Sequence, residues 1–304
     1  MSAYVAGIDG GQTSTEAVIG DEHGRIVGRG SAGPADELGV GPESNRLRDA
    51  LSAALDAARR DAGLPEATRY RAIVAGVSGY AGEVRGNAPA LPAERLTLLH
   101  DAPVAHAGAL AGEPGIVVIA GTGSFVYGSA PGVTWSGGGW GYLFGDEGSA
   151  FWTAREALSE LMRREDEGLR ADREALAACD FFGLPSLREV ARAAYAGEIG
   201  RPEIAAFAPV AMRWERFAAI GMRGAERLAT LVAAAAEAGV PATVACIGGM
   251  FGDDGFARRF TERVVEAIPS ARVVPPRYDP SAGALLIAYR EAGLGPFDAI
   301  AVRS

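Results

Sequence analysis

The chain has 304 residues, of which 48% are hydrophobic and 22% charged, so it can bury a sizeable core in about two domains. Acidic residues outnumber basic ones by 38 to 29, and this net charge of −9 disfavours nucleic acid as a partner because phosphate contacts need clustered cations. All 29 basic residues are arginine. The absence of lysine excludes a P-loop NTPase, a protein kinase and a Schiff-base enzyme. Any bound polyphosphate would therefore need backbone amides, a metal ion and arginine.

Cysteine and histidine are scarce: the chain contains only Cys179, Cys246, His23, His100 and His106. Two distant cysteines without a CxxC pattern indicate a reducing compartment, and the histidine spacing disfavours a zinc site. The N-terminus predicts a strand rather than a signal peptide. The longest apolar run, residues 228–236, is about half a membrane span. We therefore expect a cytoplasmic protein that has no membrane segment.

The first third of the chain predicts a glycine loop within a run of strands. Strand patterns occupy residues 3–9, 13–19 and 25–29, with a tight loop at Gly10-Gly11-Gln12. This order is a meander, which differs from the strand-to-helix entry of a dinucleotide-binding unit. A helix, two strands and a second helix are predicted next, at residues 43–62, 71–77, 95–100 and 103–111.

The same pattern recurs around the loop Gly121-Thr122-Gly123, which separates predicted strands at residues 116–120 and 124–129. Further strands are predicted at residues 133–135, 243–247 and 272–274, and helices at residues 148–163, 186–196, 203–238 and 281–292, with another helix after Gly248-Gly249. The recurrence predicts an α/β fold of two similar domains with mixed sheets, joined near residues 112–115.

Both glycine loops are candidate phosphate sites. A glycine turn at a strand end lets backbone N–H groups approach phosphate oxygens, and the Asp9 carboxylate before the first loop can hold Mg²⁺. Each loop alone is more typical of an ordinary hairpin turn. Two of them at matching positions favour a polyphosphate held from both sides, which would remove the need for lysine.

Asp101 follows a predicted strand and precedes a helix. It is a candidate general base for a substrate hydroxyl, and an N-cap residue is the alternative interpretation. We expect its neighbour His100 to be structural.

The densest signal is the glycine-rich segment of residues 137–141 and 145–149, which surrounds a tryptophan and two acids. Six glycines in twelve residues are costly to order, which favours a polar ligand bound by backbone and carboxylates. A helix start capped by Asp146 or Ser149 is the alternative. Gly248-Gly249 either lets the backbone approach a planar nucleotide base closely or forms a plain turn.

Together these segments resemble the sugar kinase and actin-like ATPase superfamily, and more narrowly the N-acetylglucosamine kinases grouped with the BadF/BadG/BcrA/BcrD ATPases. The resemblance extends from Tyr4 to about Ala288. Its motifs are DGGQTST and AGTGS for the two phosphate loops, GGWGYLFGDEGSAFW for the sugar site, ACIGGMF for the adenosine loop and DPSAGALLIA for the closing helix. Asp101 matches the catalytic aspartate.

The resemblance implies two actin-like (ribonuclease H-like) domains, with mixed sheets flanked by helices and an active site in the interdomain cleft. The expected N-terminal domain comprises residues 1–112 plus 283–304, and the expected C-terminal domain comprises residues 113–282. A homodimer is also expected.

The implied reaction transfers the γ-phosphoryl group of ATP, with Mg²⁺ as cofactor, to the 6-hydroxyl of a hexose. Asp101 is then the general base and Asp9 the metal-binding carboxylate. The implied sugar contacts are Asp36, Ser78, Gly139, Trp140, Gly141 and Asp146. The implied nucleotide contacts are Gly10, Gly11, Gln12, Thr13, Thr122, Gly123, Gly248 and Gly249.

The chain departs from the family pattern at several positions. Asp36 stands where many relatives carry asparagine, Leu38 replaces an aromatic residue, and Gln12 replaces a glycine. Arg213-Trp214 replaces a Gly-Asp pair. The changes at Asp36 and Leu38 affect the choice of sugar. N-acetylglucosamine is the expected substrate, and a glucosamine kinase or a broad-specificity hexokinase of the same family is the alternative. The change at Arg213-Trp214 affects nucleotide binding.

Other functions fit less well. A redox activase of acyl-CoA dehydratases would need cysteines at its dimer interface, where this chain has none in the family's positions. A non-catalytic sugar sensor would not need Asp101. A dehydrogenase would need a GxGxxG loop after the first strand.

Overall fold

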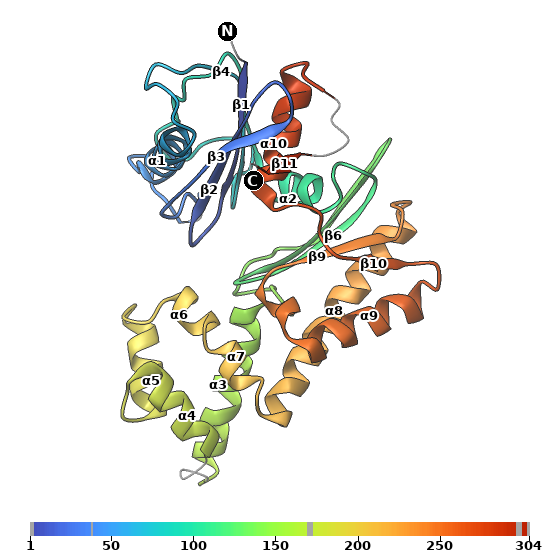
Figure 1. Ribbon diagram of the computed structural model, residues 1–304. Coiled ribbons are helices and arrows are strands. Elements are labelled where there is room, and N and C mark those ends of the chain that lie inside the picture. Colours follow the sequence, from blue (N-terminus) through green and yellow to red (C-terminus); the bar gives the residue numbers. More distant parts are fainter. Residues whose placement is uncertain (1–2, 38, 169–172, 296–299, 303–304) are drawn as a thin grey trace. The chain divides into compact units, whose positions relative to one another are not determined.

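The computed structural model describes residues 3–37, 39–168, 173–295 and 300–302. The chain divides into two compact units, which are described separately. Unit 1 contains residues 1–114 and 275–304, and unit 2 contains residues 115–274. Figure 1 shows the secondary structure elements of both.

Unit 1 is built on a six-stranded mixed sheet in the order β11-β3-β2-β1-β4-β5. Strands β1 to β3 form an antiparallel meander, and β4 and β5 run parallel to β1. The elements of unit 1 are β1 (Tyr4–Gly10), β2 (Thr15–Gly20), β3 (Arg25–Ala32), α1 (Arg46–Asp61), β4 (Tyr70–Val77), β5 (Leu96–His100), α2 (Asp101–Ala109), α10 (Pro280–Glu291) and β11 (Ala301–Val302).

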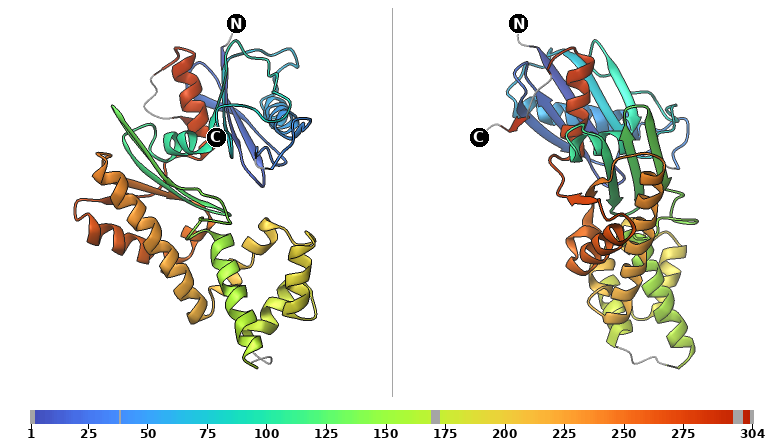
Figure 2. Two further views of the ribbon diagram at one scale, coloured as in Figure 1. Left: turned by 180° about the vertical axis from the view of Figure 1, so that it is seen from behind. Right: turned by 90° about the vertical axis from the view of Figure 1, so that its right-hand side faces the viewer.

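Side chains of β1 alternate between two hydrophobic layers, as the period of a strand requires. Ala6 and Ile8 pack in the layer of α1 with Leu51, whereas Val5 packs in the layer of α10 with Leu285. Helices α1 and α10 therefore cover opposite faces of the sheet, as Figure 2 also shows.

Helix α10 approaches β1 and α2 so closely that only glycine fits at the contacts. A Cβ atom on Gly7 would collide with the backbone of α10, and one on Gly283 would collide with the Val104 carbonyl of α2. Asp279 caps α10 by accepting hydrogen bonds from the backbone N–H of Ala282, at 2.7 Å, and from the Ser281 hydroxyl, at 2.6 Å. These contacts fix the closing helix on the strand that ends at the first glycine loop.

Unit 2 repeats this topology with a five-stranded sheet in the order β10-β9-β6-β7-β8. Its first three strands are again an antiparallel meander, and the other two run parallel to the first. The elements of unit 2 are β6 (Gly115–Ala120), β7 (Ser124–Ala130), β8 (Val133–Gly138), α3 (Ala150–Asp166), α4 (Arg173–Phe182), α5 (Leu187–Tyr195), α6 (Arg201–Ala205), α7 (Ala208–Ala211), α8 (Glu215–Glu237), β9 (Thr243–Ile247), the 3₁₀ turn η1 (Gly249–Gly252), α9 (Asp254–Ala267) and β10 (Arg272–Val274).

The shared strand order confirms the predicted fold class of two actin-like, ribonuclease H-like domains with mixed sheets flanked by helices. The two units differ in what joins their third and fourth strands. Unit 1 has α1 there, whereas unit 2 has the helices α3 to α8. The largest hydrophobic core of unit 2 joins these helices to β6, β7 and β9.

The helical region corrects two expectations. The single helix predicted over residues 203–238 is three helices, because Pro209 lies in the first turn of α7 and the extended backbone of Trp214, with ψ 126°, precedes α8. Helix α4 was not predicted, and it packs through Ala175 and Ala178 into the core of unit 2. No helix among the described residues is long and apolar enough to span a membrane.

The second junction between the units lies earlier than expected. Residues 275–282 were expected in the C-terminal domain, but they lie in unit 1. The backbone N–H groups of Arg277 and Tyr278 donate hydrogen bonds to Ala109 and Gly108 at the end of α2, at 3.0 and 3.1 Å. These bonds hold the segment that leads into α10 in unit 1.

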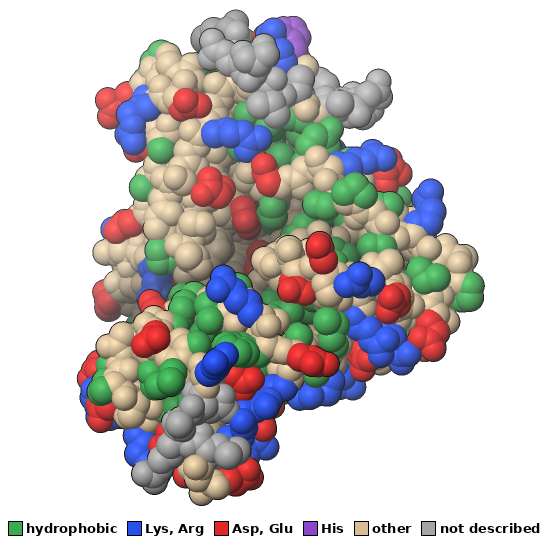
Figure 3. Space-filling view, turned by 60° about the horizontal axis from the view of Figure 1, so that its bottom comes forward, with side chains coloured by type: hydrophobic (Ala, Val, Ile, Leu, Met, Phe, Trp, Pro, Cys, Tyr) green, Lys and Arg blue, Asp and Glu red, His purple; other side chains and the backbone are tan. Residues whose placement is uncertain are grey.

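Charged side chains are interspersed over the surface, and Figure 3 shows arginines beside acidic residues over the face that it draws. Many arginines of the described residues form ion pairs, among them Arg192–Glu198 at 2.9 Å and Arg263–Glu266 at 2.5 Å.

Candidate active site

The first glycine loop lies at the end of β1 and is held by backbone hydrogen bonds. The Gly11 N–H donates to Ser14, at 2.9 Å, and the Gly11 carbonyl accepts from Ala35, at 3.1 Å. The Gly10 carbonyl accepts from the N–H of Ser78, at 2.9 Å. A Cβ atom on Gly10 would lie 3.0 Å from the Ala35 Cβ, which explains why the position is glycine. Segments after β3 and β4 therefore hold this loop in place.

The structure brings Gln12 and Ser78 together. The Gln12 side-chain amide donates to the Ser78 hydroxyl at 3.4 Å, and the Ser78 carbonyl accepts from the N–H of Glu37 at 2.9 Å. Thr13 is exposed at the tip of the loop. Candidate nucleotide and sugar contacts of unit 1 thus share one hydrogen-bonded cluster.

Asp36 is buried in this cluster and is paired with an arginine. Its carboxylate accepts hydrogen bonds from Nη1 of Arg46, at 3.2 and 3.4 Å. The neighbouring Glu37 is also buried and accepts from the backbone N–H of Arg85 at 2.5 Å. The charge of Asp36 is therefore compensated, which sequence reasoning missed because Arg46 lies on α1. Leu38 lies outside the described residues.

Asp101 is the first residue of α2, so its interpretation as an N-cap is wrong. The cap is His100, whose Nδ1 lies 3.2 Å from the N–H of Ala102 and 2.8 Å from an oxygen of Asp101. A single Nδ1 either accepts from Ala102 or, when protonated, donates to Asp101. The bond to Asp101 raises the pKa of His100, and His100 therefore contacts the candidate base rather than serving the fold alone.

Asp9 lies near the end of β1 and has an unusual electrostatic environment. Burial and the nearby carboxylates of Asp101, Asp279 and Glu16 raise the pKa of Asp9 to about 7. Asp279, by contrast, has a lowered pKa because it accepts hydrogen bonds from Ser281 and Ala282 and faces Arg29. Among the described residues, no group of three or more His, Cys, Asp or Glu side chains is placed to hold a metal ion.

The second glycine loop, in unit 2, is held from the start of α3 and from β9. The Gly121 carbonyl accepts from the N–H of Ala150 at 2.8 Å, and the Gly121 N–H donates to Gly123 at 2.9 Å. Gly248 has a φ of 108° and packs against the Ala120 carbonyl so closely that a Cβ atom would not fit. The structure therefore places the candidate adenosine loop, Gly248-Gly249, directly beside the second glycine loop.

Asp146 is almost fully buried, and its side chain points toward the second glycine loop. The carboxylate accepts hydrogen bonds from the backbone N–H groups of Ser124 and Gly141 and lies 2.6 Å from Nη2 of Arg201. Burial raises its pKa, and Arg201 opposes that shift. Asp146 also has a φ of 61°, a backbone conformation that is rare outside glycine. Of the two residues considered as the cap of the following helix, Asp146 and Ser149, it is Ser149 that caps α3, by accepting from the N–H of Trp152 at 3.1 Å.

Arg201 was not recognised from the sequence. It begins α6, and its guanidinium lies over the rings of Tyr142 and Phe151, at 5.4 and 5.7 Å from their centroids. Its Nη2 also lies 3.5 Å from the carbonyl oxygen of Thr122. A sequence separation of 55 residues from Asp146 leaves no local pattern that could have indicated the pair.

The turn between Gly139 and Gly145 presents large apolar side chains to solvent within unit 2. Trp140, Leu143 and Phe144 are 76%, 67% and 84% exposed. Gly139 has a φ of 67°, and a Cβ atom there would lie 2.5 Å from the Phe125 ring. Glycine is therefore required beside the candidate sugar-binding tryptophan.

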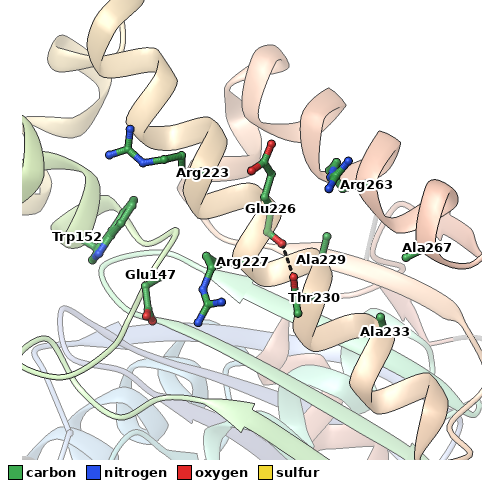
Figure 4. A pocket seen from close by; sticks show the side chains of 10 residues that line it. All are labelled: Glu147, Trp152, Arg223, Glu226, Arg227, Ala229, Thr230, Ala233, Arg263 and Ala267. Atoms are coloured by element: carbon green, nitrogen blue, oxygen red, sulfur yellow. Dashed lines mark hydrogen bonds between the residues drawn. The ribbon is translucent and has the colours of Figure 1, made fainter.

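Unit 2 also contains a pocket of about 680 Å³, lined by side chains of α8, of α9 and of the start of α3 (Figure 4). It is lined by Glu147, Trp152, Arg223, Glu226, Arg227, Ala229, Thr230, Ala233, Arg263 and Ala267. None of the predicted site residues lines it, although Glu147 directly follows Asp146.

Comparison with protein families gives a match over residues 6–288 to the BadF/BadG/BcrA/BcrD ATPase family. The chain belongs to this family. A curated relative, the N-acetylmuramic acid/N-acetylglucosamine kinase of Clostridium acetobutylicum, is 32% identical over 119 residues. This match spans 38% of either chain.

Solved structures agree with the fold of this BadF/BadG/BcrA/BcrD family member. A provisional N-acetylglucosamine kinase from Chromobacterium violaceum has a TM-score of 0.78 at 26% identity, with 94% of this chain and 99% of that chain covered. Another provisional N-acetylglucosamine kinase, from Porphyromonas gingivalis, has a TM-score of 0.69 at 18% identity, with 94% and 98% covered.

Proposed function

We propose that the protein is an ATP-dependent amino-sugar kinase that transfers the γ-phosphoryl group of ATP to the 6-hydroxyl of N-acetylglucosamine. The observation that carries this proposal is the repeated strand–glycine loop–strand device, once in each unit. The family membership and the kinase names of the relatives support it.

In this proposal Asp101 acts as the general base. The hexose 6-oxygen forms a bond to the γ-phosphorus, the bond to the β-phosphate bridging oxygen breaks, and the hydroxyl proton passes to the Asp101 carboxylate. ADP leaves with the bridging oxygen. The Asp101 side chain is partly exposed in unit 1, which leaves the carboxylate accessible to a substrate hydroxyl.

The two glycine loops would bind the triphosphate through backbone N–H groups. Gly10, Gly11, Gln12 and Thr13 supply one loop, and Thr122 and Gly123 the other, with Gly248 and Gly249 beside the nucleoside.

Mg²⁺ would neutralise phosphate charge and lie next to Asp9. Burial and the neighbouring carboxylates, which raise the pKa of Asp9 to about 7, disfavour its ionised form, and a divalent cation would favour that form. One carboxylate with water and phosphate oxygens is a typical environment for Mg²⁺.

The Asp36–Arg46 pair bears on the choice of sugar. We propose that Asp36, Ser78, Gly139, Trp140, Gly141 and Asp146 form the sugar site. An unpaired Asp36 would attract an ammonium group, but Arg46 compensates its charge. This observation favours the neutral acetamide of N-acetylglucosamine over the ammonium of glucosamine.

A screen for ADP release tests the proposal. The sugars are N-acetylglucosamine, glucosamine, glucose, N-acetylmannosamine and N-acetylmuramic acid, the last because the curated relative carries its name. We expect the highest kcat/KM with N-acetylglucosamine. ADP release that none of these sugars stimulates would contradict the proposal. The homodimer and the cytoplasmic location stay predictions.

A further inference from the structure

We propose that Arg201 is a positioning residue of the sugar site. Arg201 holds the Asp146 carboxylate against the second glycine loop, in the orientation in which this carboxylate accepts a hydrogen bond from a sugar hydroxyl. This inference rests on the proposed function. It assigns a role to the helical region that unit 2 has and unit 1 lacks, because Arg201 reaches the site from α6.

Burial and ring contacts restrict the movement of the Arg201–Asp146 pair. The side chains of Arg201 and Asp146 are only 17% and 5% exposed, and their closest atoms are 2.6 Å apart. Tyr142 and Phe151 contact the guanidinium with their ring faces, which restricts its orientation further. Burial also shields the pair from the salt screening that weakens exposed ion pairs.

The contacts of Asp146 leave room for one more donor. An ionised carboxylate offers about four acceptor positions. The N–H groups of Ser124 and Gly141 and the Nη2 of Arg201 occupy three of them. The fourth can accept a hydroxyl group while Arg201 stays bound, so Arg201 need not move for a sugar to bind.

Arg201 also links two segments with different proposed substrates. Gly141 and Asp146 belong to the proposed sugar-binding segment, whereas Ser124 and Thr122 belong to the second glycine loop. The Arg201 Nη2 lies within 3.5 Å of both Asp146 and the Thr122 carbonyl. Loss of the guanidinium would therefore remove one link between the sugar-binding segment and the phosphate loop, while the hydrogen bonds from Ser124 to Asp146 and to the Glu147 carbonyl would remain.

Arg155 provides a matched control. Its Nη1 donates to the carbonyl of Tyr142 at 3.1 Å, so it contacts the same segment as Arg201. Its ion-pair partner is Glu156, at 2.8 Å. Arg155→Met therefore removes an arginine from the same segment and leaves the Asp146 pair intact.

The experiment measures phosphorylation kinetics for the wild type and for Arg201→Met, Arg201→Lys, Arg155→Met, Asp146→Asn and the double variant Arg201→Met/Asp146→Asn. We expect Arg201→Met to lower kcat/KM for the sugar by about 10- to 100-fold, with the KM for ATP changed less than about threefold. Arg201→Lys keeps the charge without the planar fork and should recover part of the loss. The double variant should be no worse than Asp146→Asn alone.

The pH profile separates positioning from a purely structural role. Arg201, from α6, and Glu147, the neighbour of Asp146, are the charged groups that act on this carboxylate. Removal of Arg201 leaves burial and Glu147 to raise the pKa of Asp146 further. The kcat/KM of Arg201→Met should therefore rise with pH, whereas that of the double variant should not follow this titration.

The outcomes distinguish the two proposals. A wild type that phosphorylates no sugar would overturn the proposed function and, with it, the role of Arg201. An active wild type with Arg201→Met equal to Arg155→Met would overturn the role of Arg201 alone, as would additive losses in the double variant. If Arg201→Met does not fold, Arg201→Lys decides: wild-type sugar kinetics and pH dependence would contradict the proposal.

Discussion

Substitutions at Asp36 and Arg46 should shift sugar preference in opposite directions. In the wild type the Asp36 carboxylate and the Arg46 guanidinium are paired at 3.2 Å, so together they carry no net charge. Asp36→Asn leaves the Arg46 cation alone, which repels the ammonium of glucosamine. Arg46→Met leaves the buried Asp36 anion alone, which attracts it.

The magnitude follows from Coulomb's law. Two unit charges about 6 Å apart at an effective dielectric constant of about 40 interact by about 1.4 kcal/mol, which corresponds to a tenfold change in kcat/KM. The ratio of kcat/KM for N-acetylglucosamine over glucosamine should therefore rise about tenfold in Asp36→Asn and fall about tenfold in Arg46→Met. The double variant Asp36→Asn/Arg46→Met is neutral again and should return close to the wild-type ratio.

The assay is steady-state ADP release with each sugar, at a pH where the amine of glucosamine is protonated. High salt should reduce both shifts, because Arg46 is partly exposed. If both single variants shift the ratio in the same direction, or neither shifts it, the pair does not face the sugar. The part of the site after β3 would then have to be assigned anew.

Four further predictions concern the base, the metal, the titration of Asp9 and the packing of unit 1. Asp101→Asn should lower kcat by about 10²- to 10⁴-fold with sugar and ATP binding retained in calorimetry, and near wild-type turnover would show that Asp101 is not the base. Asp9→Ala should raise the Mg²⁺ requirement or abolish turnover, and an unchanged Mg²⁺ titration would place the cation elsewhere. The pKa of Asp9 is raised to about 7 in the folded protein, whereas an aspartate of the unfolded chain releases its proton above about pH 4. With EDTA present to remove metal ions, the folded protein therefore holds one more proton than the unfolded chain between these pH values. Stability should therefore fall as pH rises from about 4 to 7, and Asp9→Asn should reduce that slope in urea unfolding. Gly283→Ala should lower the free energy of unfolding by about 1–3 kcal/mol, because the new methyl group meets the Val104 carbonyl, whereas Gly33→Ala has open space and should change it little. Equal effects of the two alanines would refute the close helix contact.

Local patterns were enough to predict the architecture of the two sheets. The apolar runs that became β1 and β6 are continuous, and the glycines at residues 10–11 and 121–123 mark where each strand ends. Strand order could not be read directly, but the meander followed by parallel strands follows from short hairpin connections and from helical crossovers. The helix expected over residues 203–238 failed because Pro209 and Trp214 interrupt an otherwise helical apolar pattern.

The contacts within the candidate site were less accessible to sequence reasoning. The sequence identified Asp101 as a candidate base at the start of a helix. Its position between a strand and a helix could not show that His100, rather than Asp101, caps α2. The effect of Asp36 on sugar choice was predicted from its own negative charge alone. Arg46, ten residues away on α1, pairs with Asp36 and compensates that charge. Arg201 was missed altogether because it meets Asp146 only after the helical region has folded. Such partners depend on tertiary packing, which a single sequence does not encode in any local pattern.

Product analysis of the wild-type reaction tests the central claim most directly. Purified protein is incubated with ATP, Mg²⁺ and N-acetylglucosamine, and the phosphorylated product is examined by phosphorus and carbon NMR. The proposed function predicts one equivalent of ADP for each N-acetylglucosamine phosphorylated on its 6-oxygen. ADP formed without a sugar phosphate, or a phosphate on another oxygen, would contradict it.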